Sequence, residues 1–226
     1  MDSMEMGARP APASQQTHDD ASGAAWAGAV VVGGVILYVI LTGVAQTLPP
    51  HYSPIAQAES DLAVDLAVGP YGWLMTIVFV LRGLIAIALV VGLWRDLAPQ
   101  ARSTWGLALL VVWAAGDILL AIFPTDAPPA RPTFHGVIHL VVAFAIFIAV
   151  ALGEFRVAQC LPADPRWAPL SPWLLAIAVA SLVALLAFFL AGTASGLFGL
   201  FERLFLGLTL LWMLVAGIQL IRLQRR

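Results

Sequence analysis

Residues 71–94 read YGWLMTIVFVLRGLIAIALVVGLW, an apolar run that one charge, Arg82, interrupts. A helix needs about 20 apolar residues to cross the hydrocarbon core of a bilayer. Backbone groups in lipid must be hydrogen-bonded within the structure, and this run lacks the alternating pattern of a membrane barrel strand. The stretch therefore predicts a transmembrane helix.

Five further apolar segments repeat this pattern, with charged residues and prolines clustered between them. The six predicted spans are residues 24–46, 71–94, 104–123, 134–154, 172–191 and 198–221. In the whole chain 61% of residues are hydrophobic and 11% are charged, whereas soluble domains have about 45–50% and ~25%. The predicted fold class is an all-α, polytopic transmembrane bundle of six helices.

The composition divides the chain into three regions. Residues 1–23 combine acidic side chains with Pro, Ser, Gln and Ala, which is typical of a disordered N-terminal tail. Residues 24–223 form the predicted transmembrane domain, and residues 224–226 form a basic C-terminal end. No basic segment precedes the first span, so we expect this span to remain as an anchor and not to be cleaved.

The positions of arginine predict how the helices are oriented. All 11 basic residues are arginines. One side of the predicted bundle carries Arg9, Arg95, Arg102, Arg156, Arg166, Arg222, Arg225 and Arg226. The opposite side has only Arg131 and, at a helix entrance, Arg203. Positive residues favour the cytoplasmic side, so we expect both termini to be cytoplasmic in a bacterial or archaeal cell membrane, the inner membrane where there are two.

Tryptophans predict the same interface. Five of them stand near the expected cytoplasmic ends of the helices: Trp26, Trp94, Trp105, Trp167 and Trp173. Tryptophan is enriched where a membrane meets water, so these side chains predict an aromatic belt.

The absence of lysine excludes retinal or pyridoxal Schiff bases and a phosphate-binding P-loop. The single cysteine, Cys160, excludes an internal disulfide and a thiolate metal cluster. A net charge of −2 argues against nucleic acid as a partner. The expected partners are the lipid bilayer and a lipid-like or small-molecule ligand.

Ionisable residues also lie deep inside the predicted spans, towards the extracytoplasmic side. A charge at the centre of a membrane helix costs about 2.5–3.5 kcal/mol, so such groups must be paired or functional. Arg82 lies near mid-membrane, and Asp117 and His139 lie ~9 Å deep at about 1.5 Å per helical residue. Arg82 and Asp117 predict either a structural ion pair or a site at which Arg82 grips an anionic head group.

Two histidines suggest a metal site. His135 and His139 are four residues apart, so they share one face of a helix and are able to ligate one ion. Asp126 of FPTD, or Asp117, would add a carboxylate ligand, and zinc suits this donor set. A bound zinc ion would supply hydroxide for hydrolysis. The alternative is a histidine that only donates a hydrogen bond to a carbonyl or carboxylate.

These residues together predict a buried polar pocket on the extracytoplasmic side. Its expected lining is Glu59, Asp61, Arg82, Asp117, Asp126, His135, His139 and Glu202. In the enzyme hypothesis the pocket performs metal-assisted hydrolysis or transfer on a lipid-like substrate. Glu59, Asp117 and Arg82 are then the catalytic residues, with Glu59 as general base. The alternatives are a proton-coupled or anion transporter and a non-catalytic assembly or sensory protein.

Three stretches resemble a known family. They are YSPIAQAESDLAVDLAVGPYGWLM at residues 52–75, FPTD at 123–126 with Asp117 before it, and TFHGVIH at 133–139. Together they resemble the prokaryotic membrane family called domain of unknown function 998. The likeness extends over residues 50–140, and it implies a multi-pass fold of six or seven helices without supplying a reaction.

Overall fold

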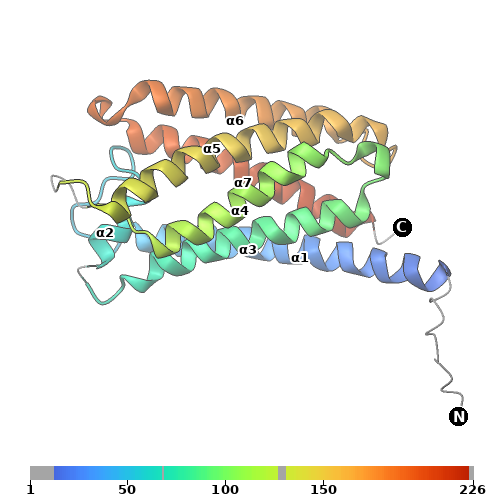
Figure 1. The fold of residues 1–226 in the computed structure, drawn as a ribbon, viewed down its shortest axis with the longest axis horizontal. Coiled ribbons are helices and arrows are strands. Elements are labelled where there is room, and N and C mark those ends of the chain that lie inside the picture. Colours follow the sequence, from blue (N-terminus) through green and yellow to red (C-terminus); the bar gives the residue numbers. More distant parts are fainter. Residues whose placement is uncertain (1–12, 68, 127–130, 224–226) are drawn as a thin grey trace, which may run out of the picture.

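The computed structural model describes residues 13–67, 69–126 and 131–223 (Figure 1). This part of the chain is helical and has no strand. Its long helices are α1 (Ala13–Ala45), α3 (Trp73–Asp96), α4 (Thr104–Ile122), α5 (Phe134–Cys160), α6 (Ser171–Ala191) and α7 (Phe198–Leu223). A short helix, α2 (Asp61–Ala67), lies in the connection between α1 and α3.

All six long helices are long and apolar enough to cross a membrane. They coincide with the six predicted spans, so the chain is an all-helical, multi-pass membrane protein. Helix α1 begins at Ala13, within the stretch predicted to be a tail. The remainder of that tail, residues 1–12, and the C-terminal end, residues 224–226, lie outside the described residues.

The six long helices pack in a closed ring in the order α1, α3, α4, α5, α6, α7 and back to α1. Large side chains fill the inside of the ring, among them Trp113, Trp212, Phe205 and Met75, all fully buried. Apolar side chains also cover much of the outer surface, as expected where the surrounding solvent is lipid. The ring therefore has an apolar core and an apolar outside.

Side-chain caps fix the starts of two helices. Ser103 accepts a hydrogen bond from the Gly106 amide at 3.1 Å, and Thr133 accepts one from the Gly136 amide at 3.1 Å. Each cap satisfies an amide that the first turn of a helix leaves unpaired. Helices α4 and α5 therefore begin directly after a capping side chain.

Helix α1 begins and α7 ends at the same end of the bundle (Figure 1). At this end Asp96 ties α3 to the loop before α6. The Asp96 carboxylate accepts hydrogen bonds from Arg166 at 3.2 Å and from the Trp167 indole at 2.7 Å. Asp164 accepts one from the Ala98 amide at 3.0 Å. These contacts hold together two loops that face water.

The expected aromatic belt is wrong for Trp167. Its ring is fully buried, because the indole N–H finds the Asp96 carboxylate inside the bundle. The other four tryptophans of the belt, Trp26, Trp94, Trp105 and Trp173, are exposed. A buried indole N–H usually has an acceptor, and sequence position alone did not reveal that Asp96 is the acceptor for Trp167.

The opposite end of the bundle carries α2 and the long connection that precedes it (Figure 1). This connection packs on the start of α7, where the Leu200 amide donates to the Ile55 carbonyl at 2.9 Å. Arg203 donates to the Gln57 carbonyl at 2.9 Å. Hydrogen bonds from α7 to backbone carbonyls of the connection thus hold the connection over this end of the ring of helices.

Gly83 allows α3 to approach α4 closely. A Cβ atom at residue 83 would lie 2.8 Å from the Ala114 carbonyl oxygen and 2.9 Å from Ile118 Cγ1. Overpacking of this kind costs about 1–3 kcal/mol, so we expect Gly83→Ala to lower the thermal midpoint of unfolding in detergent. Gly33→Ala is the matched control, because a Cβ there meets no atom within 4 Å. Equal midpoints for the two variants would contradict this packing.

Asp164 makes the contacts between the loop after α3 and the loop before α6 sensitive to acid. Burial alone would raise the pKa of Asp164, but hydrogen bonds from Arg166 and the Ala98 amide outweigh burial and place it below the ordinary 3.8. A carboxyl group whose pKa is lower in the folded protein stabilises the fold above its unfolded pKa, and this stabilisation is lost in acid. We expect Asp164→Asn to lower the melting temperature near neutral pH, and the difference from wild type to shrink below pH 3.8. A difference that stays constant on acidification would show that Asp164 does not act through its charge.

Candidate functional site

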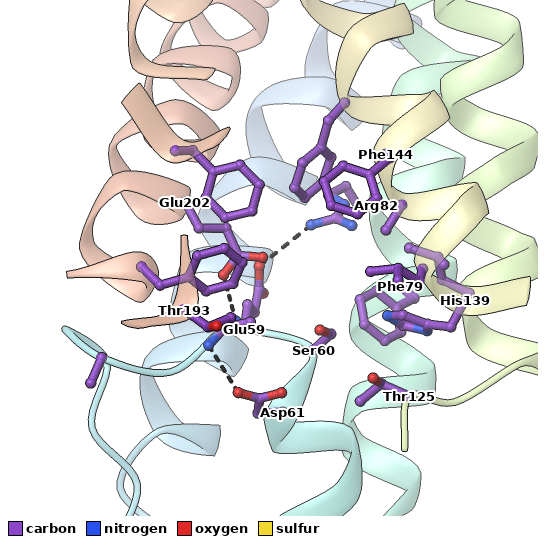
Figure 2. Close-up of a pocket in the computed structure, with 18 residues that line it drawn as sticks. Glu59, Ser60, Asp61, Phe79, Arg82, Thr125, His139, Phe144, Thr193 and Glu202 are labelled. Carbon is purple, nitrogen blue, oxygen red and sulfur yellow. Dashed lines mark hydrogen bonds and ion pairs between the residues drawn. The ribbon is translucent and has the colours of Figure 1, made fainter. Parts of the chain in front are cut away.

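A pocket of about 320 Å³ lies at the end of the bundle that carries α2 (Figure 2). Five phenylalanines form most of its apolar wall: Phe79, Phe144, Phe147, Phe188 and Phe198. Its polar lining consists of Glu59, Ser60, Asp61, Arg82, Thr125, His139, Thr193 and Glu202. The pocket thus combines an aromatic part with a group of polar side chains contributed by several helices.

Arg82 of α3 is the centre of a buried ionic network and is only 2% exposed. Its Nε and Nη2 atoms donate to the two oxygens of Asp117 on α4, at 2.9 and 2.6 Å. Its Nη1 atom donates to the Tyr38 hydroxyl at 3.1 Å and lies 3.4 Å from a Glu59 oxygen. The guanidinium also lies over the Phe79 ring, 5.5 Å from its centre. The predicted ion pair with Asp117 is therefore present, and every nitrogen of Arg82 has a partner.

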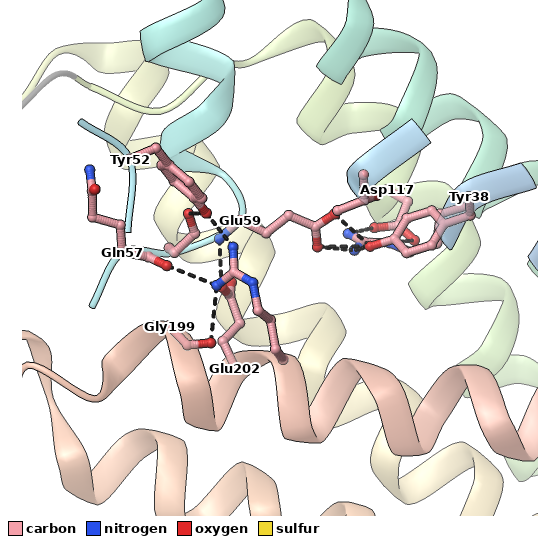
Figure 3. Close-up of polar contacts among 11 residues, drawn as sticks. Tyr38, Tyr52, Gln57, Glu59, Asp117, Gly199 and Glu202 are labelled. Atoms are coloured by element: carbon pink, nitrogen blue, oxygen red, sulfur yellow. Dashed lines mark hydrogen bonds and ion pairs between the residues drawn. The ribbon is translucent and has the colours of Figure 1, made fainter. Parts of the chain in front are cut away.

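Glu59 joins this network to α7 (Figure 3). Its carboxylate accepts hydrogen bonds from the Tyr38 hydroxyl at 2.6 and 2.7 Å and from Thr42 at 3.3 Å. Its backbone amide donates to a Glu202 oxygen at 2.6 Å. Glu59 stands just before α2, so these contacts hold the connection inside the ring of helices.

A second polar group surrounds Arg203, one turn from the start of α7 (Figure 3). Arg203 donates to the carbonyls of Gln57 and Gly199 at 2.9 and 3.0 Å and to the Tyr52 hydroxyl. Burial raises the pKa of Tyr52, so its hydroxyl keeps the hydrogen that it donates to the Ala58 carbonyl at 2.6 Å. Arg203 is therefore bound to the connection, whereas the sequence suggested only a position near the membrane surface.

His139 of α5 lines the pocket and has one ring nitrogen without a hydrogen-bond partner among the described residues. Its Nδ1 lies 2.7 Å from the Phe123 carbonyl oxygen, which is only able to accept, so Nδ1 carries the hydrogen. Its Nε2 is buried and has no hydrogen-bond partner in the described part of the chain. In the neutral ring this nitrogen is an acceptor. Figure 2 shows the imidazole beside Phe79, across the cavity from Glu59 and Glu202.

Two of the expected metal ligands, His135 and Asp126, are held by other contacts. His135 packs against the rings of Phe123 and Phe134, with centroids 5.3 and 6.2 Å away. Asp126 accepts hydrogen bonds from the Thr133 hydroxyl and amide at 2.6 and 2.8 Å, and these bonds lower its pKa. The described residues contain no group of three His, Cys, Asp or Glu side chains that would hold a metal ion.

The structure thus brings together most of the predicted pocket. Glu59, Asp61, Arg82, His139 and Glu202 line the cavity. The other three predicted lining residues, Asp117, Asp126 and His135, do not. Asp117 is bound to Arg82, while Asp126 and His135 are held by their local loop and helix contacts.

Sequence reasoning missed Tyr38 and the aromatic wall. Tyr38 is the polar residue of α1 that binds both Glu59 and Arg82, and its place in an otherwise apolar span was a usable signal. The phenylalanines were indistinguishable from ordinary apolar residues of membrane helices, so their convergence required the packing of α3, α5, α6 and α7.

Comparison with protein families gives one match. A family model described as Protein of unknown function (DUF998) matches residues 31–219, which is more than half of the chain. No curated protein and no solved structure matches the chain.

The buried ion pair predicts a specific pattern of stability. Arg82→Leu leaves Asp117 buried without its cation, and Asp117→Asn leaves Arg82 without its bidentate partner. Removing one member of a buried pair costs about 3–5 kcal/mol, whereas replacing both members is often nearly neutral. We expect each single variant to lower the free energy of unfolding in detergent, and the double variant to recover part of the loss. Simple addition of the two losses would show that the side chains are not coupled.

Proposed function

The chain belongs to the family described as Protein of unknown function (DUF998), and within it we propose that this protein binds a lipid-like amphiphile in the pocket between α3, α5, α6 and α7. The observation that carries the proposal is the division of the cavity into an aromatic wall and a polar lining. Ligand pockets are commonly apolar with a few placed polar groups that orient the ligand. An amphiphile matches both parts.

The pocket reaches the outer surface of the bundle. Leu140 and Phe144 of α5 line the cavity, yet they are 56% and 38% exposed. On a membrane protein such an exposed apolar surface faces acyl chains. We infer that the hydrocarbon chain of the ligand enters from the bilayer at α5 and lies against the phenylalanines.

The polar head group then lies among Glu59, Glu202 and His139, close to α2. This end of the bundle is the one that the arginine distribution assigns to the extracytoplasmic side. The ligand would therefore come from the outer leaflet, with its head group near the water interface.

Hydrolysis or group transfer on the bound amphiphile is the catalytic form of this proposal. The general-base role expected for Glu59 is disfavoured, because its carboxylate already accepts from Tyr38 and Thr42 and faces Arg82. Glu202 and His139 both line the cavity and are better placed to move a proton. A zinc site at His135, His139 and Asp126 would require Asp126 to leave Thr133, so the geometry favours binding over metal-assisted chemistry.

The alternative of a transporter has one favourable observation. Ionisable residues buried inside a membrane bundle are typical of transport pathways, and this bundle buries Glu59, Arg82, Asp117 and Glu202. Anion transport fits less well, because Arg82 is already bound by two carboxylates. A purely structural or sensory role would not account for the aromatic pocket.

The proposal is tested by filling the pocket. Ala143 lines the cavity, whereas Val141 on the same helix is 63% exposed and faces outward. We expect at least one of dodecanol, dodecylamine and dodecanoate to bind saturably to the protein in phosphatidylcholine nanodiscs, above the level of empty discs. Ala143→Phe should weaken this binding by about tenfold or more, which is ~1.4 kcal/mol, because the new ring occupies the cavity.

Val141→Phe is the matched control and should leave the affinity within about twofold, because its ring points into lipid and adds no volume to the cavity. Radiolabelled probes measure the affinity directly. Absence of saturable binding by all three probes, or equal loss in both variants, would contradict the proposed function.

A further inference from the structure

We infer that the ligand of this pocket is a long-chain amine, with a positively charged head group that carries N–H donors. The inference rests on the proposed function and adds the chemical class of the ligand. It follows from the charges and from the hydrogen-bonding roles of the side chains that line the cavity.

Acidic side chains outnumber basic ones around the cavity. Glu59, Asp61 and Glu202 line it, and Arg82 is the one cationic side chain among the lining residues. Arg82 does not balance them, because two of its nitrogens are bound by Asp117, which lies behind it. Arg203 is turned to the carbonyls of Gln57 and Gly199. A ligand with a positive charge would therefore complete the charge balance, whereas an anion would meet carboxylates and an occupied arginine.

The hydrogen-bonding groups point to the same head group. Carboxylate oxygens only accept, and the His139 ring is set by Phe123 so that Nε2 is an acceptor as well. His139 lines the cavity, is only 3% exposed, and has its Nε2 buried without a hydrogen-bond partner in the described chain. A buried polar atom without a partner is costly unless a ligand or water satisfies it. An ammonium group has three N–H donors, and one of them would bind this nitrogen.

The aromatic wall supports a cation in addition to a hydrocarbon chain. The Arg82 guanidinium already lies 5.5 Å from the centre of the Phe79 ring, so a cation is accommodated on this wall. Phenyl faces attract ammonium groups within about 6 Å. Figure 2 shows Phe79 and His139 on one side of the cavity and Glu59 and Glu202 on the other.

The test compares head groups on one chain length. Dodecylamine, dodecyltrimethylammonium, dodecanol and dodecanoate are titrated against the full chain in phosphatidylcholine nanodiscs near neutral pH, where the amine is protonated. We expect dodecylamine to bind at least about tenfold more tightly than dodecanol and dodecanoate. Dodecyltrimethylammonium should bind less tightly than dodecylamine, because it has the charge without N–H donors.

Charge-removing variants connect this preference to the pocket. In Glu202→Gln the new amide oxygen is still able to accept from the Glu59 amide, while the acidic group is lost. We expect about tenfold weaker binding of dodecylamine and unchanged binding of dodecanol. Asp61→Asn is the second variant and should also weaken the binding of dodecylamine. It provides the test if Glu202→Gln does not fold. Glu154→Gln is the control, because Glu154 is a fully buried glutamate of α5 that does not line the cavity.

The outcomes separate the two proposals. Dodecanol or dodecanoate binding as tightly as dodecylamine would overturn the amine inference and leave the proposed function standing. Equal binding of dodecyltrimethylammonium and dodecylamine would overturn the requirement for N–H donors. Absence of saturable binding by all four probes would overturn the proposed function itself.

Discussion

The pairing of Arg82 with Asp117 is the constraint on which the site depends. A guanidinium inside an apolar bundle is tolerated only when its donors are satisfied, and Asp117 satisfies two of its nitrogens. The remaining nitrogen faces Tyr38 and Glu59. The register of α3 against α4 and the position of the connection before α2 are thus linked through one side chain.

The same network explains why the connection before α2 closes one side of this end of the bundle, while a cavity lies on the other side. Glu59 joins the connection to α1 and α3 through its side chain and to α7 through its amide. Arg203 holds the same connection from α7. Towards α5 and α6 no comparable polar contact with the connection is described, and the cavity lies there between phenylalanine rings. The ion pair therefore has a structural role, while the residues around it form a surface for a ligand.

Prediction from the sequence succeeded where one local property decides the outcome. Five of the six helices begin within about two residues of the predicted spans, because hydrophobic length controls insertion of a helix into a membrane. The Arg82–Asp117 pair was predictable because an unpaired charge there is too costly. Prediction of the pocket lining from the sequence failed for two residues whose local contacts keep their side chains away from the cavity. Asp126 binds Thr133, seven residues along the chain, and His135 stacks on Phe123, so neither reaches the cavity that His139 lines.

The amino-acid pattern alone established a multi-pass helical membrane protein with ionisable residues that must find partners within the bundle. This follows from the transfer free energy of each segment, which is a property of composition and length. Which carboxylates pair with Arg82 and which remain at the cavity was decided only by the packing of the helices. The place of His139 at the cavity and the convergence of five phenylalanines likewise depend on how α3, α5, α6 and α7 are rotated. That rotation is set by contacts between segments far apart in the chain, which hydrophobic periodicity does not encode.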